Sequence, residues 1–299
     1  MIQPLSFQVV CFGETLWDIL PDSFQPGGAP MNVAYHLNKL GLHPALITRI
    51  GTDVLGSRLV GLFQENNIST DYFQVDGKYA TGKVYAKPDS QGEVDYEIVY
   101  PSAWDCIAWE DRFTPLLQQA HYFVYGSLTS RNPESRQTLH RLLEEATIKV
   151  FDTNLRPPYF ERSQVEYLMQ QADILKMNQS EFDHIAGWFR QYRQPEDQMR
   201  FFQDRFQLET VVVSRAGAGA LMLHKGGLYR HQGYGVAVQD TIGCGDGFIA
   251  GLLHQLCKGA APAAVLPYAN ALGALVATYP GACPDYETEE IFSLINSAE

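Results

Sequence analysis

A glycine-rich segment, Asp240–Phe248, carries the most specific chemistry in this sequence. It leads into an apolar stretch that we predict to be a helix beginning near Asp246. Gly243, Cys244 and Gly245 would present backbone N–H groups at the start of that helix, which favours a bound anion. A carboxylate beside an anion suits a general base that takes a proton from a hydroxyl attacking a phosphoryl group. The structural alternative is that the Asp246 carboxylate only caps the helix.

A second segment, Gly27–Gly41, places Gly27 and Gly28 before another predicted helix, with Asn32 in its first turn. Glycines let the backbone approach a ligand closely, and an amide side chain both donates and accepts, which suits sugar hydroxyls. Asp18 follows the first predicted strand, and its carboxylate could accept hydrogen bonds from two adjacent hydroxyls. Each feature also fits an ordinary loop or helix start.

A third polar segment, Asp152–Pro158, follows another predicted strand and contains Asn154 and Arg156. Both side chains are expected in the crevice at the carboxyl ends of the strands. Arg156 would supply the positive charge that an acidic protein needs near a phosphate group.

The fourth segment, Lys176–Glu181, again follows a strand and spaces Asn178 and Glu181 three residues apart. This spacing also fits a capping arrangement, in which Asn178 caps a helix and Glu181 bonds back to it. The two interpretations are compatible.

One motif is misleading. Gly77–Lys83 matches the glycine and lysine positions of a phosphate-binding P-loop, but Val84 stands where Ser or Thr would hold Mg²⁺. The residues that follow alternate as a strand does, whereas a P-loop leads into a helix. We therefore reject a P-loop here.

Composition narrows the class of partner. The chain has 299 residues and a net charge of −12, which disfavours nucleic acid and anionic membranes. Its five cysteines are scattered and include no C-x-x-C pair, which argues against a disulfide framework or a zinc site. The first residues do not read as a signal peptide, and no apolar run is long enough to span a membrane, so we expect a cytoplasmic protein.

Strand-like and helix-like segments alternate along the chain, which predicts a mostly parallel sheet covered by helices on both faces. The rhythm is interrupted between residues 72 and 100, where period-two alternation around Asp89–Gly92 predicts a β-hairpin. Long apolar helices are expected at Asp246–Cys257 and Pro262–Thr278.

Taken in order, the GG-x-x-x-N, N-x-x-E and D-T-x-G-x-G-D segments resemble those of the ribokinase-like (PfkB) carbohydrate kinases. The resemblance extends from about Gly13 to Pro284, and the run Asn154–Pro158 looks most like that of bacterial fructokinases. It implies a single three-layer α/β/α domain over residues 1–299. A small β-sheet lid would be formed mainly by residues of about 14–26 and 72–105.

The same resemblance implies roles for individual residues. Asp246 would be the catalytic base, with Gly243, Cys244, Gly245 and Arg156 around the transferred phosphoryl group. The sugar would contact Asp18, Gly27, Gly28, Asn32 and Asn154. The nucleotide would lie near Asn178, Glu181, Ser214, Gly217, Gly219 and Asn270. Glu181 would act on Mg²⁺ indirectly, and a monovalent cation such as K⁺ would lie near Asp240, Thr241 and Gly281.

The expected reaction is transfer of the γ-phosphoryl group of ATP to a free sugar, with fructose as the first choice. Ribose, 2-keto-3-deoxygluconate and a nucleoside remain alternative acceptors. A non-catalytic sugar- or nucleotide-binding regulator is a different class, and the intact Asp246 and glycines argue against it. A dinucleotide-binding oxidoreductase lacks its glycine fingerprint after the first strand. The free strand edges of a lid could also pair two subunits into a homodimer.

Overall fold

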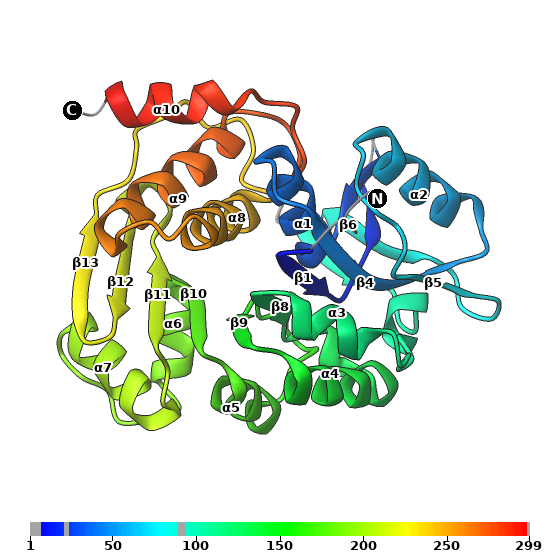
Figure 1. Cartoon of the computed structure of the whole chain (residues 1–299), viewed down its shortest axis with the longest axis horizontal. Helices are drawn as coiled ribbons and strands as arrows, with labels where there is room; N and C mark the ends of the chain where they lie inside the picture. Colours follow the sequence, from blue (N-terminus) through cyan, green and yellow to red (C-terminus); the bar gives the residue numbers. More distant parts are fainter. Residues whose placement is uncertain (1–6, 21–23, 89–93, 298–299) are drawn as a thin grey trace.

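The computed structural model describes residues 7–20, 24–88 and 94–297 and has an α/β architecture (Figure 1). Nine strands of the described chain form one large sheet, in the order β13-β12-β11-β10-β9-β8-β1-β4-β5. They are β1 (Val9–Phe12), β4 (Pro44–Gly51), β5 (Phe73–Asp76), β8 (Tyr122–Gly126), β9 (Ile148–Asp152), β10 (Ile174–Asn178), β11 (Thr210–Ser214), β12 (Ala220–His224) and β13 (Gly227–His231). Strand β12 is antiparallel to both neighbours, and every other pairing in this sheet is parallel.

Helices cover both faces of the large sheet, as Figure 1 shows. One face carries α1 (Ala29–Lys39), α2 (Val54–Glu65), α8 (Cys244–Cys257) and α9 (Pro262–Ala277), and α10 (Thr288–Ser297) packs on α9. The other carries α3 (Phe113–Gln119), α4 (Pro133–Glu145), α5 (Arg162–Gln171), α6 (Gln179–Ala186) and α7 (Pro195–Phe206). The described residues also include three short 3₁₀ helices, η1 (Ala103–Cys106), η2 (Leu128–Arg131) and η3 (Ala216–Ala218). The predicted three-layer arrangement is confirmed.

Strand β1 shows why the central strands read as unbroken apolar runs. Its side chains alternate between the two faces, so that Val9 and Cys11 join one core cluster while Val10 and Phe12 join the other. All four are fully buried. A parallel strand covered by helices on both sides therefore needs apolar residues at every position.

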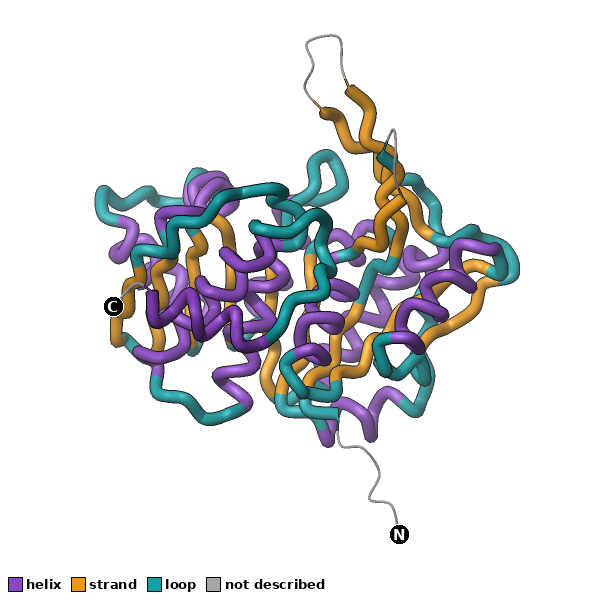
Figure 2. Tube along the Cα trace, turned by 90° about the horizontal axis from the view of Figure 1, so that it is seen from above, coloured by secondary structure: helices purple, strands orange, loops and turns teal. Residues whose placement is uncertain are grey.

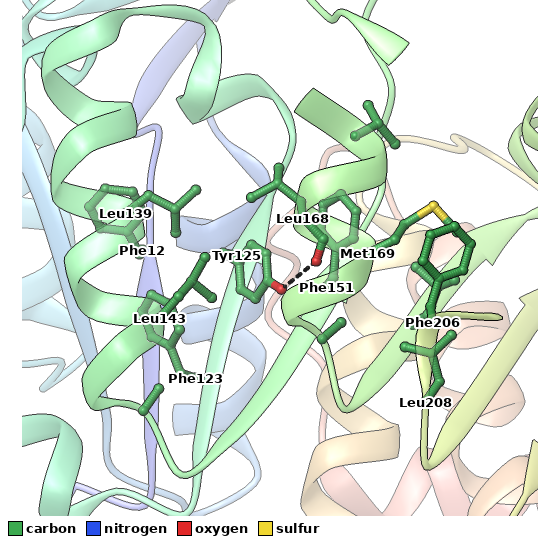
Figure 3. Close-up of a cluster of buried hydrophobic side chains, with 14 of the residues drawn as sticks. Phe12, Phe123, Tyr125, Leu139, Leu143, Phe151, Leu168, Met169, Phe206 and Leu208 are labelled. Carbon is green, nitrogen blue, oxygen red and sulfur yellow. Dashed lines mark hydrogen bonds between the residues drawn. The ribbon is translucent and has the colours of Figure 1, made fainter. Parts of the chain in front are cut away.

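Figure 3 shows part of the core beneath α4 and α5, where aromatic rings from neighbouring strands pack together. The rings of Tyr125 and Phe151 are stacked with their centroids 5.1 Å apart. The Tyr125 hydroxyl donates a hydrogen bond of 3.1 Å to the backbone carbonyl of Leu168, so this buried polar group is satisfied.

A second, four-stranded sheet projects from the body of the molecule (Figure 2). It consists of β2 (Leu16–Ile19), β3 (Phe24–Gly27), β6 (Gly82–Pro88) and β7 (Val94–Ile98), in the order β3-β2-β6-β7. Its base has a small core of its own, formed by Leu16, Val84, Ile98, Trp104 and Leu128. This core joins the small sheet to η1 and η2 of the body.

Three features differ from the sequence prediction. The stretch predicted for the lid begins at residue 72, but β5 pairs with β4 and forms an edge of the large sheet. Helix α8 begins at Cys244 rather than at Asp246. Helices α3 and α5 have no counterpart in the prediction. The turn predicted at residues 89–92 lies outside the described residues.

Within the described ranges, every helix is too short or too polar to cross a lipid bilayer.

Candidate active site

Most of the polar segments singled out in the sequence meet at one edge of the large sheet. The parallel strands β1, β9, β10 and β11 all end at this edge, because neighbouring parallel strands point the same way. Helix α8 begins close by, and its first turn contacts side chains from α1 and β10. The fold therefore brings together residues that are more than 200 positions apart in the chain, such as Asn32 and Asp246.

Asp246 is the third residue of α8, and its carboxylate does not cap the helix. The N-cap is Gly243, with φ of 78°, and no side chain caps this end. The Asp246 Oδ2 atom instead accepts a hydrogen bond of 2.8 Å from the Asn32 amide. The Asn32 Oδ1 atom in turn accepts from the Cys283 thiol at 3.4 Å. The capping alternative is therefore wrong, and Asp246 faces the element expected to hold the sugar.

The surroundings of Asp246 adjust its basicity. The pKa of Asp246 is raised to about 7, mainly by burial and also by the negative charge of Asp152, against the opposing effects of the Asn32 hydrogen bond, Lys176 and Arg156. A pKa near neutrality is the value that suits a general base under cellular conditions. The position and the raised pKa of this carboxylate are those that the predicted general base would need.

The start of α8 has the open amides that an anion site needs, although they lie one residue further along the chain than predicted, because the Cys244 N–H already donates to the Thr241 carbonyl at 3.5 Å. A helix leaves its first N–H groups without intrahelical acceptors, so the amides of Gly245 and Asp246 are available to a ligand. Gly243 must be glycine, because a Cβ atom there would lie 2.6 Å from the Ala282 Cα atom, and its φ is positive. Burial raises the pKa of the Cys244 thiol to about 11, so it stays neutral beside these amides.

Lys176 and Asp152 form a buried ion pair that sequence reasoning missed. They are direct neighbours in the register of β9 and β10, and the ammonium Nζ lies 3.1 and 3.2 Å from the two Asp152 carboxylate oxygens. A Cβ atom on Gly245 would lie only 3.3 Å from Nζ. Burial raises the pKa of Asp152 to about 6, and the Lys176 ammonium opposes this rise. The sequence placed Lys176 in a motif but gave no reason to pair it with Asp152.

Asp18 lies on β2 of the small sheet and packs closely against Gly27 on β3. A Cβ atom on Gly27 would lie 2.3 Å from the Asp18 Oδ2 atom, so a larger residue there would displace this carboxylate. Burial raises the pKa of Asp18 to about 6, and the charge of Arg156 lowers it. Gly28 has φ of 113° and abuts the carbonyl of Glu14, so it too requires glycine.

Arg156 lies among acidic groups that come from separate parts of the chain. Its side chain is exposed, and its positive charge lowers the pKa values of Glu14, Asp18, Asp152 and Asp246. An exposed guanidinium among carboxylates can bind a phosphate group that enters from solvent. Asn154 precedes it with an unusual φ of 36°.

Glu14 is a second residue that sequence reasoning missed. It is buried, its Oε2 atom accepts a hydrogen bond of 2.8 Å from Thr129, and burial raises its pKa. Its place directly after β1 was the available signal, because polar residues at the carboxyl end of a parallel strand line the ligand crevice.

Asn178 and Glu181 form the predicted capping box. The Asn178 Oδ1 atom accepts from the Glu181 N–H at 2.9 Å, and Glu181 Oε2 accepts from the Asn178 N–H at 2.8 Å. Glu181 also accepts from the Thr153 hydroxyl and the Leu155 N–H. Because its oxygens already have these donors, Glu181 fits contact with Mg²⁺ through water rather than direct ligation.

The other residues predicted for the nucleotide come from β11, the turn that follows it, and α9. Ser214 ends β11, and Gly217 and Gly219 lie in the turn between β11 and β12, beside the carboxyl end of β10. Gly219 has φ of 83°, and a Cβ atom there would overlap the His231 carbonyl oxygen. Asn270 is buried on α9, where its amide donates to the Leu266 carbonyl at 2.8 Å.

The predicted cation site joins two loops. The Asp240 carboxylate accepts from the Ile242 N–H and from the Gly281 N–H, both at 3.0 Å. Gly281 has φ of 75°, and Thr241 is exposed. This arrangement holds the loop before α8 against the segment after α9.

Comparison with known proteins places these features in a family. The family model described as pfkB family carbohydrate kinase matches residues 7–289. The probable fructokinase-6, chloroplastic, of Arabidopsis thaliana is 29% identical over 94% of this chain and 80% of its own length.

Solved structures match over almost the whole chain. The fructokinase of Xylella fastidiosa with bound ATP has a TM-score of 0.87 at 24% identity, over 98% of this chain and 99% of that chain. The fructokinase of Vibrio cholerae O395 with fructose, ADP and calcium has a TM-score of 0.83 at 23% identity, over 98% of this chain and 100% of that chain. These similarities confirm the predicted fold.

The family match covers nearly all of the described chain, and the Asp246, Asn32 and α8 arrangement lies within it. This chain therefore belongs to the pfkB family of carbohydrate kinases.

Proposed function

We propose that this chain is an ATP-dependent fructokinase. The observation that carries the proposal is the Asp246 carboxylate, whose pKa burial raises to about 7, beside the open amides of α8 and in contact with Asn32. The relatives named fructokinase support fructose as the acceptor. Asp18, Gly27, Gly28, Asn32 and Asn154 would contact the sugar.

In this reaction Asp246 takes the proton of the attacking sugar hydroxyl. The hydroxyl oxygen forms a bond to the γ-phosphorus, and the bond from that phosphorus to the bridging oxygen breaks, leaving ADP. The amides of Gly245 and Asp246 and the Arg156 guanidinium stabilise the negative charge on the transferred group. The small sheet would act as a lid that keeps water away from the phosphates.

The nucleotide would lie over the turn that contains Gly217 and Gly219, with Ser214, Asn178 and Asn270 nearby. Mg²⁺ bound with ATP would neutralise phosphate charge, and Glu181 would orient its water ligands. Asp240, Thr241 and Gly281 would surround a monovalent cation such as K⁺. Neighbouring structures with ATP, or with ADP and calcium, support the use of a nucleotide and a metal ion.

The substrate prediction is tested by coupled measurement of ADP formation with Mg²⁺ and a panel of acceptors. We expect kcat/KM to be higher for fructose than for ribose, 2-keto-3-deoxygluconate or adenosine. A higher value for ribose or adenosine would overturn the choice of fructose and leave the kinase reaction standing. No sugar-dependent ADP formation with any acceptor would favour the non-catalytic regulator.

A further inference from the structure

We propose that Lys176 is a catalytic residue whose ammonium group binds the transferred phosphoryl group in the anion site, and that Asp152 positions it. This inference rests on the proposed phosphoryl transfer and adds a cation to it that comes from inside the protein. The reaction is otherwise unchanged, and Lys176 stays protonated throughout because Asp246 takes the proton.

The first observation is the position of the Lys176 Nζ atom. It lies beside the first turn of α8, 3.3 Å from where a Cβ atom on Gly245 would be. An anion held by the Gly245 and Asp246 amides would thus lie next to an ammonium group. Helix N-termini and cations attract the same ligands, and together they make a stronger site than either alone.

The second observation concerns the hydrogen bonds of Nζ. An ammonium group has three N–H donors, and the two acceptors that Nζ has in the described part of the chain are both oxygens of Asp152. The remaining donor has no acceptor among the described residues, although the side chain is only 6% exposed. Buried N–H donors normally have a hydrogen-bond acceptor, so this donor is available to a bound ligand.

The third observation is the charge state of the pair. Burial alone would lower the pKa of Lys176, but Asp152, Glu181 and Asp246 raise it above its ordinary value. Lys176 is therefore a permanent cation at neutral pH. Asp152 offsets the cost of burying it and fixes the direction of its amine.

The chain offers a matched control on the same two strands. Lys149 on β9 and Asp173 before β10 form a second Lys–Asp pair, 3.8 Å apart, at the opposite end of these strands. Lys149→Met removes a charge from the same strand pair without touching the site. We expect its kinetic constants to equal those of the unaltered chain.

The central test compares Lys176→Met with Lys176→Arg and Lys149→Met. We expect Lys176→Met to lower kcat by about 10²–10³-fold, as for the loss of one transition-state donor. Its Kd for Mg²⁺-ATP should rise while its Kd for Mg²⁺-ADP changes little, because only ATP carries the transferred group. Lys176→Arg should recover part of the activity, because it keeps the charge.

A pH profile separates this role from a purely structural one. The ionisable groups around Asp246 are Asp152, Lys176, Arg156, Cys244 and Cys283. Removing the Lys176 charge should move the acid limb of kcat/KM to higher pH, whereas Asp152→Asn should move it to lower pH. A limb that moves in both variants while the Kd for Mg²⁺-ATP stays that of the unaltered chain would mean that the pair acts only through the pKa of Asp246, and it would overturn phosphoryl binding by Lys176.

Wild-type kcat and unchanged ATP affinity in folded Lys176→Met would overturn the inference, as would losses that only follow the melting temperature. If that variant fails to fold, the Lys176→Met, Asp152→Asn double variant removes both buried charges. We expect it to fold and to remain slow, and near-normal turnover would overturn the inference. The ratio of ATP to ADP affinity requires no sugar, so it tests Lys176 even if fructose proves to be the wrong acceptor.

Discussion

At the scale of single residues, the chemistry of the site depends on how burial shifts the pKa values of its acidic and basic side chains. Asp246, Asp152 and Asp18 all have raised pKa values, because each carboxylate is withdrawn from water. A neighbouring acid adds to the rise for Asp246 and for Asp152. The cations Lys176 and Arg156 limit this rise. Asp246 has the highest value of the three, which marks it as the group able to take a proton near neutral pH.

The first prediction at this scale is the pH dependence of the unaltered enzyme. Asp246 must be deprotonated to act as the base, so kcat/KM for fructose should fall tenfold for each pH unit below about 7. Initial rates between pH 5 and 9 measure this, with circular dichroism at each pH to show that the protein stays folded. An acid limb near pH 4 would mean that the base is an ordinary exposed carboxylate.

At the scale of elements, the N-terminus of α8 is the feature on which the proposed anion site depends. Three consecutive residues without bulky side chains begin the helix after Gly243, whose positive φ turns the chain into it. The loop before the helix is fixed by Asp240, which bonds to Ile242 and Gly281. The site is thus supported by hydrogen bonds that are already made before a ligand arrives.

The prediction for this element is the effect of Gly245→Val. The new side chain would press on the Lys176 amine and cover the amides, so we expect kcat to fall by about two to three orders of magnitude. Gly61→Val on α2 is the control, because no atom lies within 4 Å of a Cβ atom there. Both variants should have melting temperatures close to that of the unaltered protein. Normal turnover by folded Gly245→Val would contradict the anion site.

At the scale of the whole molecule, the large sheet was predictable because its strands are continuous apolar runs between helices with clear spacing. The small sheet was only partly predictable. Strands β2 and β3 have four residues each, and β3 contains Pro26 and Gly27, which usually mark a loop. Strand β2 pairs with β6, which is more than 60 residues further along the chain, and no local sequence pattern predicts such a contact.

The candidate site was also only partly predictable, because some of its contacts join segments that are distant in the sequence. Asp246, Asn32, Gly28 and Glu181 could be singled out as candidates because glycines and spacing mark them in the sequence. Lys176 was not assigned, because a lysine within the run Ile174–Met177 gives no sign of its partner. Its role depends on the neighbouring positions of β9 and β10, which only the fold establishes. Helix α5 could have been found, since Val165, Leu168 and Met169 have helical spacing and are all buried.

The central claim is that Asp246 is the general base of sugar phosphorylation, and the most direct test is kcat of Asp246→Asn with fructose and Mg²⁺-ATP. The amide keeps the shape of the carboxylate but cannot take the proton, so we expect kcat to fall by roughly 10²–10⁴-fold. A raised carboxyl pKa means that the ionised form destabilises the fold above about pH 7, so the melting temperature at pH 8 should be unchanged or higher. Nucleotide binding should persist or tighten. Full activity of Asp246→Asn would contradict the account.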